Sequence, residues 1–402
     1  MSIAWRVPLD SRFDSAQTFF AQFGDPRPQN AERQPIQFFE PLIKNRCHIR
    51  HTVQSQVGTL VPEGEDGPTA DGLKNKTGPV FMSKQGVLIF NPRSGRGKAT
   101  VRARDFSDHW KARFGTELAL RPTRSLADIR VAARETWQPD TVQIFMGGDG
   151  TLSESLQGLA IQSHFQPITR PVGFLPGGTG NSFLRDFNIL DYKDARDRLL
   201  RALEDESIID VDSGIITYNE INEEEPAVPG DLVQRITFNI WGVELIGEIT
   251  ELAIKMRAIG SLNYTVASVF KMMSHKPWTV TAVIDGQRET FNCNMISVHN
   301  SRFTGGAMEI APDVRINDGR LFLLILKSQN RSQLFKAFPE IFKGTHVNNP
   351  HVETRFIEEL RLERRRPFLM NVDGELETGW QPRLQIKPRF FRLFMPAEDV
   401  KK

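Results

Sequence analysis

The sequence predicts an α/β domain with a parallel sheet, followed by a domain made mainly of β-strands. Between about residues 84 and 205, short apolar runs alternate with amphipathic helical stretches, a pattern typical of a parallel sheet covered by helices. From about residue 206 onward, strand-like segments follow one another and are joined by glycine-containing turns. This second pattern indicates an antiparallel sandwich or barrel-like domain.

Composition narrows the class of protein. Of the 402 residues, 25% are charged and 39% are hydrophobic, which is ordinary for a globular protein. A net charge of +2 argues against a nucleic-acid-binding protein. The two cysteines fit a reduced setting, no stretch of 18 apolar residues occurs, and the first residues lack the apolar core of a secretory signal. We therefore expect a cytoplasmic protein.

Residues 1–80 are predicted to form an N-terminal extension that is partly flexible. The segment Pro62–Pro68 is acidic and rich in turn-forming residues, as in a flexible linker. Phe38–Ile43 and His48–Val53 have the composition of a small strand pair. No function is predicted for this extension.

The α/β domain is predicted to span residues 81–205. Buried strands are expected at Gly86–Phe90, Val142–Phe145 and Val172–Leu175. Helices are expected at 99–114, 126–137, 152–161 and 194–206.

The β-rich domain is predicted to span residues 206–386. Strands are expected at 208–217, 236–241, 278–284, 294–298 and 321–326, with a helical interruption at about 245–275.

Three glycine-rich turns each follow a predicted strand of the α/β domain. They are Asn91–Lys98, Met146–Thr151 and Pro176–Asn181. Glycines allow a backbone to approach a phosphate closely and to present its N–H groups to it. Turns at the carboxyl ends of parallel strands also lie at the edge where α/β sheets bind ligands. One such turn is most often a plain tight turn, but three in order predict a phosphate-binding site.

Carboxylates accompany these turns. Asp149 stands between two glycines, where it can take a proton or hold a metal ion. Capping of the next helix is the alternative, and the flanking glycines favour the functional role. Glu154 has the spacing of a reciprocal helix cap, and this role is as well supported as catalysis. Asp373 and Glu375 flank Gly374, which alone is most often a hairpin turn.

The four blocks NPRSGRGK, GGDGT, PGGTGN and NVDGE, in this order, resemble the diacylglycerol kinase catalytic domain family. That family includes sphingosine, ceramide and bacterial lipid kinases. The resemblance covers roughly residues 84 to 396. GGDGT alone is not specific, because NAD kinases and phosphofructokinases carry similar loops.

The resemblance implies a Rossmann-like nucleotide-binding domain followed by an all-β sandwich-like lipid-binding domain, the NAD kinase/diacylglycerol kinase-like plan. The C-terminal tail 387–402 is expected to return to the first domain. The implied reaction is phosphorylation of the primary hydroxyl of a diacylglycerol, sphingoid base or related lipid, with ATP and Mg²⁺ as cofactors.

Site residues follow from the motifs and the resemblance together. Asp149 and Glu375 are the candidate catalytic groups, and Asp373 and Glu375 are the candidate metal ligands. The division of base and metal roles between Asp149 and Glu375 stays open. The residues expected around the nucleotide are Asn91, Ser94, Gly95, Gly97, Gly148, Gly150, Thr151, Gly178, Thr179 and Asn181.

The lipid side of the site is less well marked. Asp210 and Asp212 lie where relatives carry an acidic residue associated with headgroup recognition, and a surface strand-edge role is the plainer alternative. Leu262–Trp278, including Tyr264, combines apolar bulk with lysines and is a candidate for lipid entry. An ordinary helix packed on a sheet is as well supported. We expect a membrane lipid substrate, peripheral membrane contact and no nucleic-acid partner, and the oligomeric state stays open.

Ser182 departs from the bacterial relatives, which usually carry aspartate at this place. The departure moves the expected substrate slightly towards sphingoid-like or unusual lipids. Two rival functions remain. An NAD kinase would share GGDGT but lack the first and third blocks, and an inactive lipid-binding or scaffold protein would not need both Asp149 and Glu375.

Overall fold

The computed structural model describes residues 85–177, 181–256 and 263–396, all within the unit Gly78–Lys402. The linker and strand pair predicted within residues 1–80 lie outside the described residues, as do Gly178 and Thr179.

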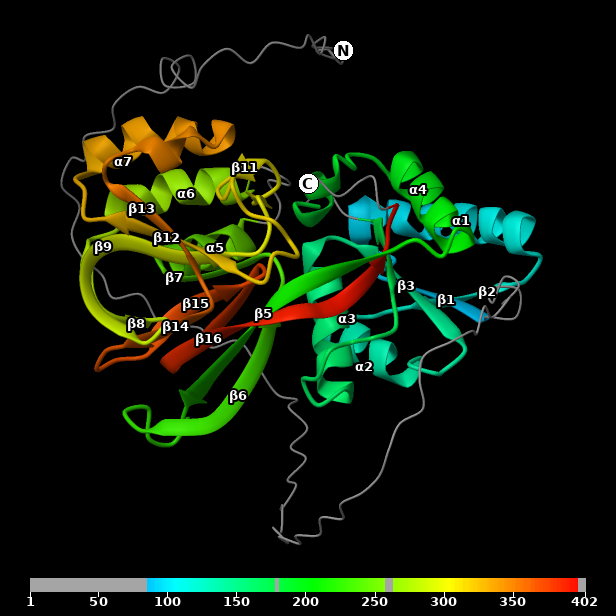
Figure 1. Cartoon of the computed structure of the whole chain (residues 1–402), viewed down its shortest axis with the longest axis horizontal. Helices are drawn as coiled ribbons and strands as arrows, with labels where there is room; N and C mark the ends of the chain where they lie inside the picture. The colour runs from blue at the N-terminus through cyan, green and yellow to red at the C-terminus, as the bar shows by residue number, and fades with distance from the viewer. Residues whose placement is uncertain (1–84, 178–180, 257–262, 397–402) are drawn as a thin grey trace, which may run out of the picture. The chain divides into compact units, whose positions relative to one another are not determined.

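A four-stranded parallel sheet with strand order β2-β1-β3-β4 forms the centre of the α/β domain (Figure 1). Its strands are β1 (Gln85–Phe90), β2 (Leu118–Pro122), β3 (Thr141–Gly147) and β4 (Gly173–Pro176). The three buried runs that predicted strands are β1, β3 and β4, and the short strand β2 was not predicted. β2 has only one buried residue, Leu118, so its sequence gives little sign of a sheet position.

The helices of this domain confirm the four that the sequence predicts. They are α1 (Lys98–Phe114), α2 (Leu126–Glu135), α3 (Asp149–Gln162) and α4 (Tyr192–Glu204). The short 3₁₀-helix η4 (Ser94–Gly97) directly precedes α1, and η5 (Phe183–Phe187) lies between β4 and α4. The largest difference is at α3, which begins at Asp149 with Gly148 as its N-cap. The glycine-rich turn after β3 is therefore itself the first turn of a helix whose positive end faces the carboxyl edge of the sheet.

The β-rich domain is a ten-stranded antiparallel sheet, accompanied by the small pair β10 and β11. Strands β9, β7, β15, β16, β14 and β8 pair in that order, and β8 pairs with β9 again, so this part of the sheet closes on itself. Its strands are β5 (Ile208–Ile221), β6 (Pro229–Thr237), β7 (Ile240–Glu244), β8 (Trp278–Ile284), β9 (Gln287–His299), β10 (Phe303–Thr304), β11 (Met308–Glu309), β12 (Leu321–Lys327), β13 (Val352–Ile357), β14 (Glu359–Glu363), β15 (Phe368–Val372) and β16 (Glu375–Phe394).

One predicted strand is broken in the structure. The apolar run 236–241 predicted a single strand, but β6 ends at Thr237 and β7 begins at Ile240. The Asp373 carboxylate accepts hydrogen bonds from the backbone N–H groups of Phe238, Asn239 and Ile240. Those donors are therefore used at the break, and a pattern of apolar residues cannot reveal this.

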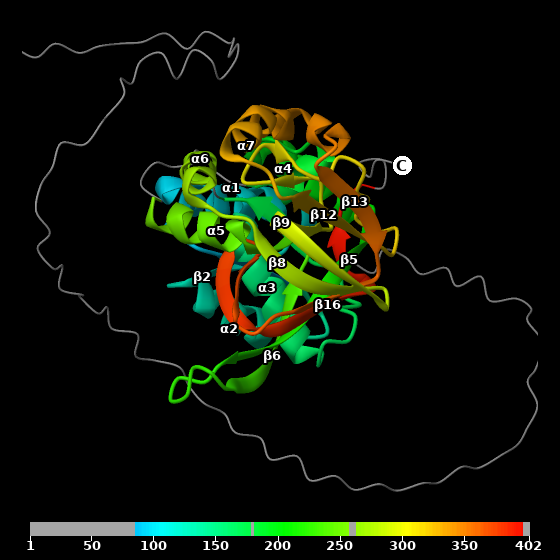
Figure 2. The same ribbon diagram turned by 90° about the vertical axis from the view of Figure 1, so that its left-hand side faces the viewer.

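Helices cover one side of the closed sheet. They are α5 (Leu245–Lys255), α6 (Asn263–Ser274) and α7 (Arg331–Ala337), followed by the 3₁₀-helices η7 (Phe338–Lys343) and η8 (Thr345–Asn348). Figure 2 shows α6 and α7 at the same end of this domain. Among the described residues no helix is both long and apolar enough to cross a bilayer.

The end of β16 joins the two domains. Phe391–Phe394 pairs with the start of β5, and Leu393 forms a parallel bridge with Val172 beside β4. Side chains of Phe390, Phe391, Leu393 and Phe394 belong to the hydrophobic core of the α/β domain. The described part of the tail 387–396 thus lies against the first domain.

Candidate active site

A cavity of about 490 Å³ lies where the carboxyl ends of β1 and β3 face the β-rich domain. Both domains supply its wall, so neither domain forms it alone. The lining residues predicted from the sequence are Asn91, Ser94, Gly148, Asp149, Gly150, Thr151, Tyr264, Asp373 and Glu375. Gly95, Gly97 and Asn181 do not line it among the described residues.

The loop after β1 is folded tightly. The Asn91 side-chain oxygen accepts the Arg93 N–H at 2.9 Å, and its carbonyl oxygen accepts the Ser94 N–H at 2.9 Å. Gly95 has a φ of 60°, and a Cβ atom there would lie 2.3 Å from the Gly177 carbonyl oxygen. Only glycine allows this loop and the turn after β4 to approach so closely.

Gly95→Ala is expected to displace the loop and to raise the KM for ATP by about tenfold or more, because 1.4 kcal/mol corresponds to a factor of ten. Titration of initial rates with ATP measures the change. Gly115→Ala is the matched control, because Gly115 also has a positive φ, of 71°, but no atom lies within 4 Å of its added Cβ. Equal KM values for the two variants would contradict the steric argument.

Asp149 joins the second turn to the third. Its carboxylate accepts the backbone N–H of Ser182 at 2.8 Å and that of Phe183 at 3.3 Å, at the start of η5. Asp149 therefore caps a neighbouring helix rather than its own. Burial raises the pKa of Asp149 above its ordinary value, and these hydrogen bonds oppose the rise only in part. A carboxylate with a raised pKa is a stronger proton acceptor.

Ser182 connects the third turn to the β-rich domain. Its hydroxyl accepts the N–H of Gly306 at 3.0 Å, while its own N–H is donated to Asp149. Gly306 and its neighbours Thr304 and Gly305 line the cavity. The residue that departs from the bacterial pattern thus holds the two halves of the cavity together.

The segment Asp373–Gly374 is a two-residue hairpin turn between β15 and β16, as the plainer interpretation expected. Both residues have positive φ, 51° and 94°, which matches the right-handed twist of the flanking strands. The hairpin nevertheless places Glu375 at the cavity. A hairpin turn is therefore compatible with the catalytic or metal-binding role predicted for Glu375.

The carboxylate of Asp373 is almost fully engaged. One oxygen accepts the Thr237 hydroxyl and the Asn239 and Ile240 N–H groups, and the other accepts the Phe238 N–H. Burial raises the pKa of Asp373 to about 6 against these hydrogen bonds. The contacts are those of a brace for the β6–β7 break, and the metal role predicted for Asp373 stays a prediction that they do not favour.

Glu375 faces the start of α3. A Cβ atom added to Gly150 would lie 3.4 Å from the Glu375 carboxylate. The Tyr264 hydroxyl lies 3.5 Å from the carbonyl oxygen of Gly374, the residue before Glu375. The structure therefore brings Asp149, Glu375 and Tyr264 to one cavity from three different elements.

Asp210 and Asp212 lie outside the lining of this cavity. Asp210 forms an ion pair with Arg392 at 2.9 Å. Asp212 is buried and accepts the N–H of Gly319 at 2.6 Å and that of Arg389 at 2.7 Å, and burial raises its pKa. Neither lines the cavity, so no contact seen here supports the predicted headgroup role.

Sequence reasoning missed two asparagines in the cavity wall. Asn239 accepts the Ser301 hydroxyl, and Asn371 accepts the Gly374 N–H. Asn371 is the first residue of the NVDGE block, so the sequence motif could have identified it. Asn239 lies inside an apolar run that predicted a strand, and no sequence signal marked it.

Glu154 does not form the reciprocal helix cap that its spacing suggested. Its carboxylate forms ion pairs with Arg130 of α2 and, at 3.2 Å, with Arg235 of β6. Arg235 also forms an ion pair with Glu377, and the Glu377 carboxylate accepts a hydrogen bond from the Tyr218 hydroxyl at 2.9 Å. This buried network, here called the Glu154–Arg235 network, links the α/β domain to β16 two residues beyond Glu375.

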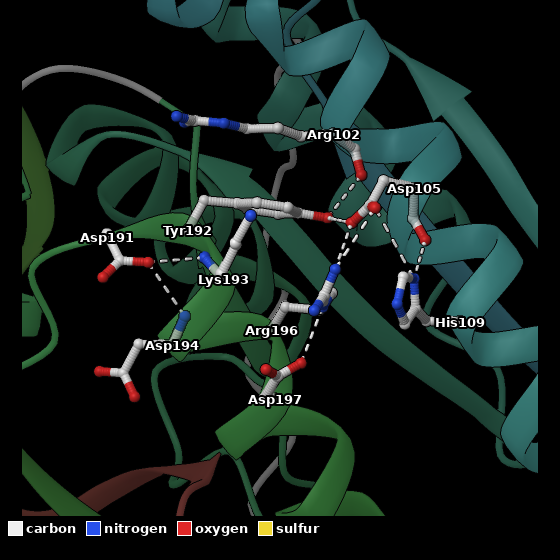
Figure 3. Close-up of polar contacts among 9 residues, drawn as sticks. All are labelled: Arg102, Asp105, His109, Asp191, Tyr192, Lys193, Asp194, Arg196 and Asp197. Atoms are coloured by element: carbon white, nitrogen blue, oxygen red, sulfur yellow. Dashed lines mark hydrogen bonds and ion pairs between the residues drawn. The ribbon is translucent and has the colours of Figure 1, made fainter.

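A second polar cluster fixes α4 on α1 (Figure 3). The Tyr192 hydroxyl lies 2.7 Å from both the Asp105 carboxylate and the Arg102 carbonyl oxygen, and can donate to either. Arg196 pairs with Asp105 at 3.0 Å. The Arg102 side chain donates to the Pro176 carbonyl oxygen at 3.0 Å, so the cluster also anchors the start of the third turn.

Comparison with known proteins shows that this chain is similar to lipid kinases. Residues 85–215 match the diacylglycerol kinase catalytic domain, and residues 243–395 match the YegS C-terminal NAD kinase beta sandwich-like domain. Residues 85–215 thus have the sequence of a diacylglycerol kinase catalytic domain. A kinase domain implies the use of ATP.

Individual relatives agree with this assignment. The chain is 26% identical to a diacylglycerol kinase of Bacillus subtilis, over 73% of this chain and 90% of that protein. It is also 26% identical to a diacylglycerol kinase of Mycobacterium tuberculosis, over 69% of this chain and 84% of that protein. A crystal structure of a diacylglycerol kinase from Bacillus anthracis has the same fold, with a TM-score of 0.57 and 18% identity over 79% of this chain and 98% of that one.

Proposed function

We propose that this protein is an ATP-dependent kinase that phosphorylates the primary hydroxyl of a diacylglycerol, a sphingoid base or a related lipid. The observation that carries the proposal is the meeting of Asp149 and Glu375 at one cavity with the glycine-rich turns and with Tyr264. In this proposal the α/β domain is a Rossmann-like nucleotide-binding domain, and the β-rich domain is a sandwich-like lipid-binding domain.

The phosphates of ATP would lie against the loop after β1 and the amino end of α3. A helix begins at Asp149, and the positive end of a helix together with its unpaired N–H groups favours a bound phosphate. Ser94 and Thr151 supply hydroxyls to the same wall. Phosphoryl transfer requires mainly positioning and charge neutralisation, and these groups provide the positioning.

Asp149 is the group best suited to take the proton of the attacking hydroxyl. It is held by two backbone N–H groups, and its pKa is raised by burial, so its lone pairs are both oriented and basic. Transfer would form a bond from the lipid oxygen to the γ-phosphorus and break the bond to the β–γ bridging oxygen, with ADP as the leaving group.

Mg²⁺ fits the donor set only as an ion shared with the nucleotide. Among the described residues, no three His, Cys, Asp or Glu side chains gather around one point. Mg²⁺ in kinases is usually held by one or two carboxylates and by substrate phosphates, so Glu375 is the carboxylate that would hold it together with the phosphates of ATP. When bound, the ion would neutralise charge on the β- and γ-phosphates.

The residues that line the cavity favour a lipid headgroup without negative charge. The described lining residues include the carboxylates Asp149, Asp373 and Glu375 and no lysine or arginine. An anionic headgroup would therefore add further negative charge to a partly buried space that already holds these carboxylates and the phosphates of ATP. Ile240 and Ile254 give the same wall apolar surface for the substrate.

The test is incubation of the pure protein with Mg²⁺ and radiolabelled ATP, with diacylglycerol, sphingosine, ceramide and monoacylglycerol in mixed micelles and with NAD alongside. Label in an organic-phase product is the expected result and names the lipid class. Label only in NADP would replace the proposal with an NAD kinase, and no label in any product would leave a lipid-binding scaffold.

Glu375→Gln is expected to reduce turnover by about 10²-fold or more, because it removes a carboxylate at the phosphates without changing side-chain size. Steady-state rates in the same assay measure this. Glu358→Gln is the control, since Glu358 is exposed in the connection between β13 and β14. Unchanged rates in Glu375→Gln would remove this residue from the mechanism.

A further inference from the structure

The outward face of α6 is apolar where a helix of a soluble domain is normally polar. Val266, Phe270 and Met273 are spaced i, i+4 and i+7 and so lie along one side of the helix, here called the α6 stripe. Phe270 is 51% exposed and Met273 is 44% exposed. The opposite side, with Ala267, Ser268 and Met272, is already buried in the domain.

The neighbouring helices extend this apolar surface. α6 and α7 lie side by side, and η7 continues directly from α7 (Figures 1 and 2). Phe342 of η7 is 39% exposed, and its ring packs edge-on against that of Phe338 at 5.7 Å between centroids. Three large apolar side chains, from two helical segments, are thus exposed at one end of the β-rich domain.

The two segments that carry these side chains are mainly basic. Within residues 263–277 and 331–345, Glu340 is the single acidic residue. The basic residues of the same segments are Lys271, Lys276, Arg331, Lys336 and Lys343. All except Lys271, which pairs with Glu248 at 3.8 Å, are exposed. Exposed apolar side chains among lysines are the composition of a surface that binds anionic lipid.

The same helix also reaches the active site. Asn263 and Tyr264, at the start of α6, line the cavity that holds Asp149 and Glu375. Phe270 and Met273 lie about 9 Å and 14 Å further along the helix axis, at 1.5 Å per residue. α6 therefore connects the exposed apolar surface with the place where a lipid headgroup would react.

We propose that α6, α7 and η7 form the surface by which this protein docks on a membrane containing anionic phospholipid, with the α6 stripe and Phe342 inserted at the headgroup level. The inference rests on the proposed lipid kinase function and deepens it, because it names the partner from which the substrate is taken. Charge and apolar exposure together select a membrane over a second copy of this chain.

Binding to vesicles tests the surface directly. The full-length protein is sedimented with vesicles of phosphatidylcholine alone or with phosphatidylglycerol. Binding is expected only with the anionic lipid, and the double variant Phe270→Ser with Met273→Ser is expected to weaken it by about tenfold or more. Lys336→Gln with Lys343→Gln is expected to weaken binding about fivefold for each charge removed and to reduce its sensitivity to salt.

Matched controls separate this face from general exposure and charge. Val101→Ser replaces an apolar side chain that is 70% exposed on α1, and Lys193→Gln removes an exposed charge on α4. Both are expected to bind vesicles like the parent. Equal loss in the control and test variants, or no loss in the test variants, would overturn the proposal.

Two further measurements keep the outcomes distinct. Turnover of a short-chain, water-soluble lipid is expected to be the same in the parent and in Phe270→Ser with Met273→Ser, which shows that the fold and site are intact.

Light scattering after size-exclusion chromatography reports the oligomeric state. A parent dimer that this double variant converts to monomer would assign the face to a second copy and overturn the membrane proposal. Failure of turnover with every lipid would contradict the proposed function, while vesicle binding would still be read separately.

Discussion

Asp149→Asn is expected to reduce kcat by about 10²- to 10⁴-fold, the usual contribution of a positioned general base. The amide has the same shape but cannot take a proton. Its oxygen can still accept one of the two N–H groups, from Ser182 and Phe183, that Asp149 accepts now. Single-turnover rates with saturating ATP and lipid measure the chemical step, and circular dichroism checks that the fold is retained.

Asp140→Asn is the matched control for this change. Asp140 is exposed and directly precedes β3, so it lies at the opposite end of the strand that leads to Asp149. Its variant is expected to react like the parent. If Asp149→Asn also retained parental rates, the proton would have to leave by another route, and Glu375 would become the first alternative.

The same assignment predicts the pH profile of the parent enzyme. A general base must be ionised, so kcat/KM is expected to fall as the pH drops through the pKa of Asp149. Because burial raises that pKa, the acid limb should lie above the ordinary carboxylate value of 3.8. An acid limb at or below the ordinary value would be inconsistent with Asp149 as the base.

Glu154→Ala is expected to lower the free energy of unfolding by about 3–5 kcal/mol, because it removes one of the two carboxylates, Glu154 and Glu377, that pair with the buried Arg235 guanidinium. Arg235 is 7% exposed at its side chain and Glu154 is 5% exposed, so water cannot replace the lost carboxylate. Urea titration followed by tryptophan fluorescence gives the free energy. Glu154→Gln should recover part of the loss, since the amide oxygen can still accept a hydrogen bond from Arg130 or Arg235.

The control for the network is an exposed ion pair. Glu135 of α2 is 59% exposed and pairs with Arg121 at 3.5 Å. Glu135→Ala is expected to change the unfolding free energy by less than about 1 kcal/mol, as exposed pairs usually do. A similar small effect in both variants would show that the Glu154–Arg235 network does not stabilise the protein.

The sequence predicted those strands, helices and loops whose formation depends on residues close together in the chain. The alternation of apolar runs and amphipathic stretches predicted three of the four strands and all four α-helices described in the α/β domain, because buried strands are apolar and each helix buries one face against the sheet. The glycine-rich blocks predicted the loops at Asn91, Ser94 and Asp149, because a phosphate-binding turn needs glycines at fixed positions. The resemblance to known kinases added Glu375.

What the sequence did not predict depends on residues far apart in the chain. The break between β6 and β7 requires Asp373, more than a hundred positions away, to accept the donors at Phe238 and Ile240. Glu154 pairs with Arg235 across the two domains and does not form the reciprocal helix cap that its spacing suggested. Asp212 supports Gly319 and the bulge at Arg389, which only the folded chain brings together.

The return of β16 has a consequence for how this protein is made and divided. Phe390, Phe391, Leu393 and Phe394 complete the core of a domain whose other residues are translated some two hundred positions earlier. The α/β domain therefore cannot finish folding until the end of β16 has left the ribosome. Residues 85–215 match one family domain, but this segment is not expected to fold on its own. A fragment that ends at residue 215 would expose the apolar surface that the end of β16 covers.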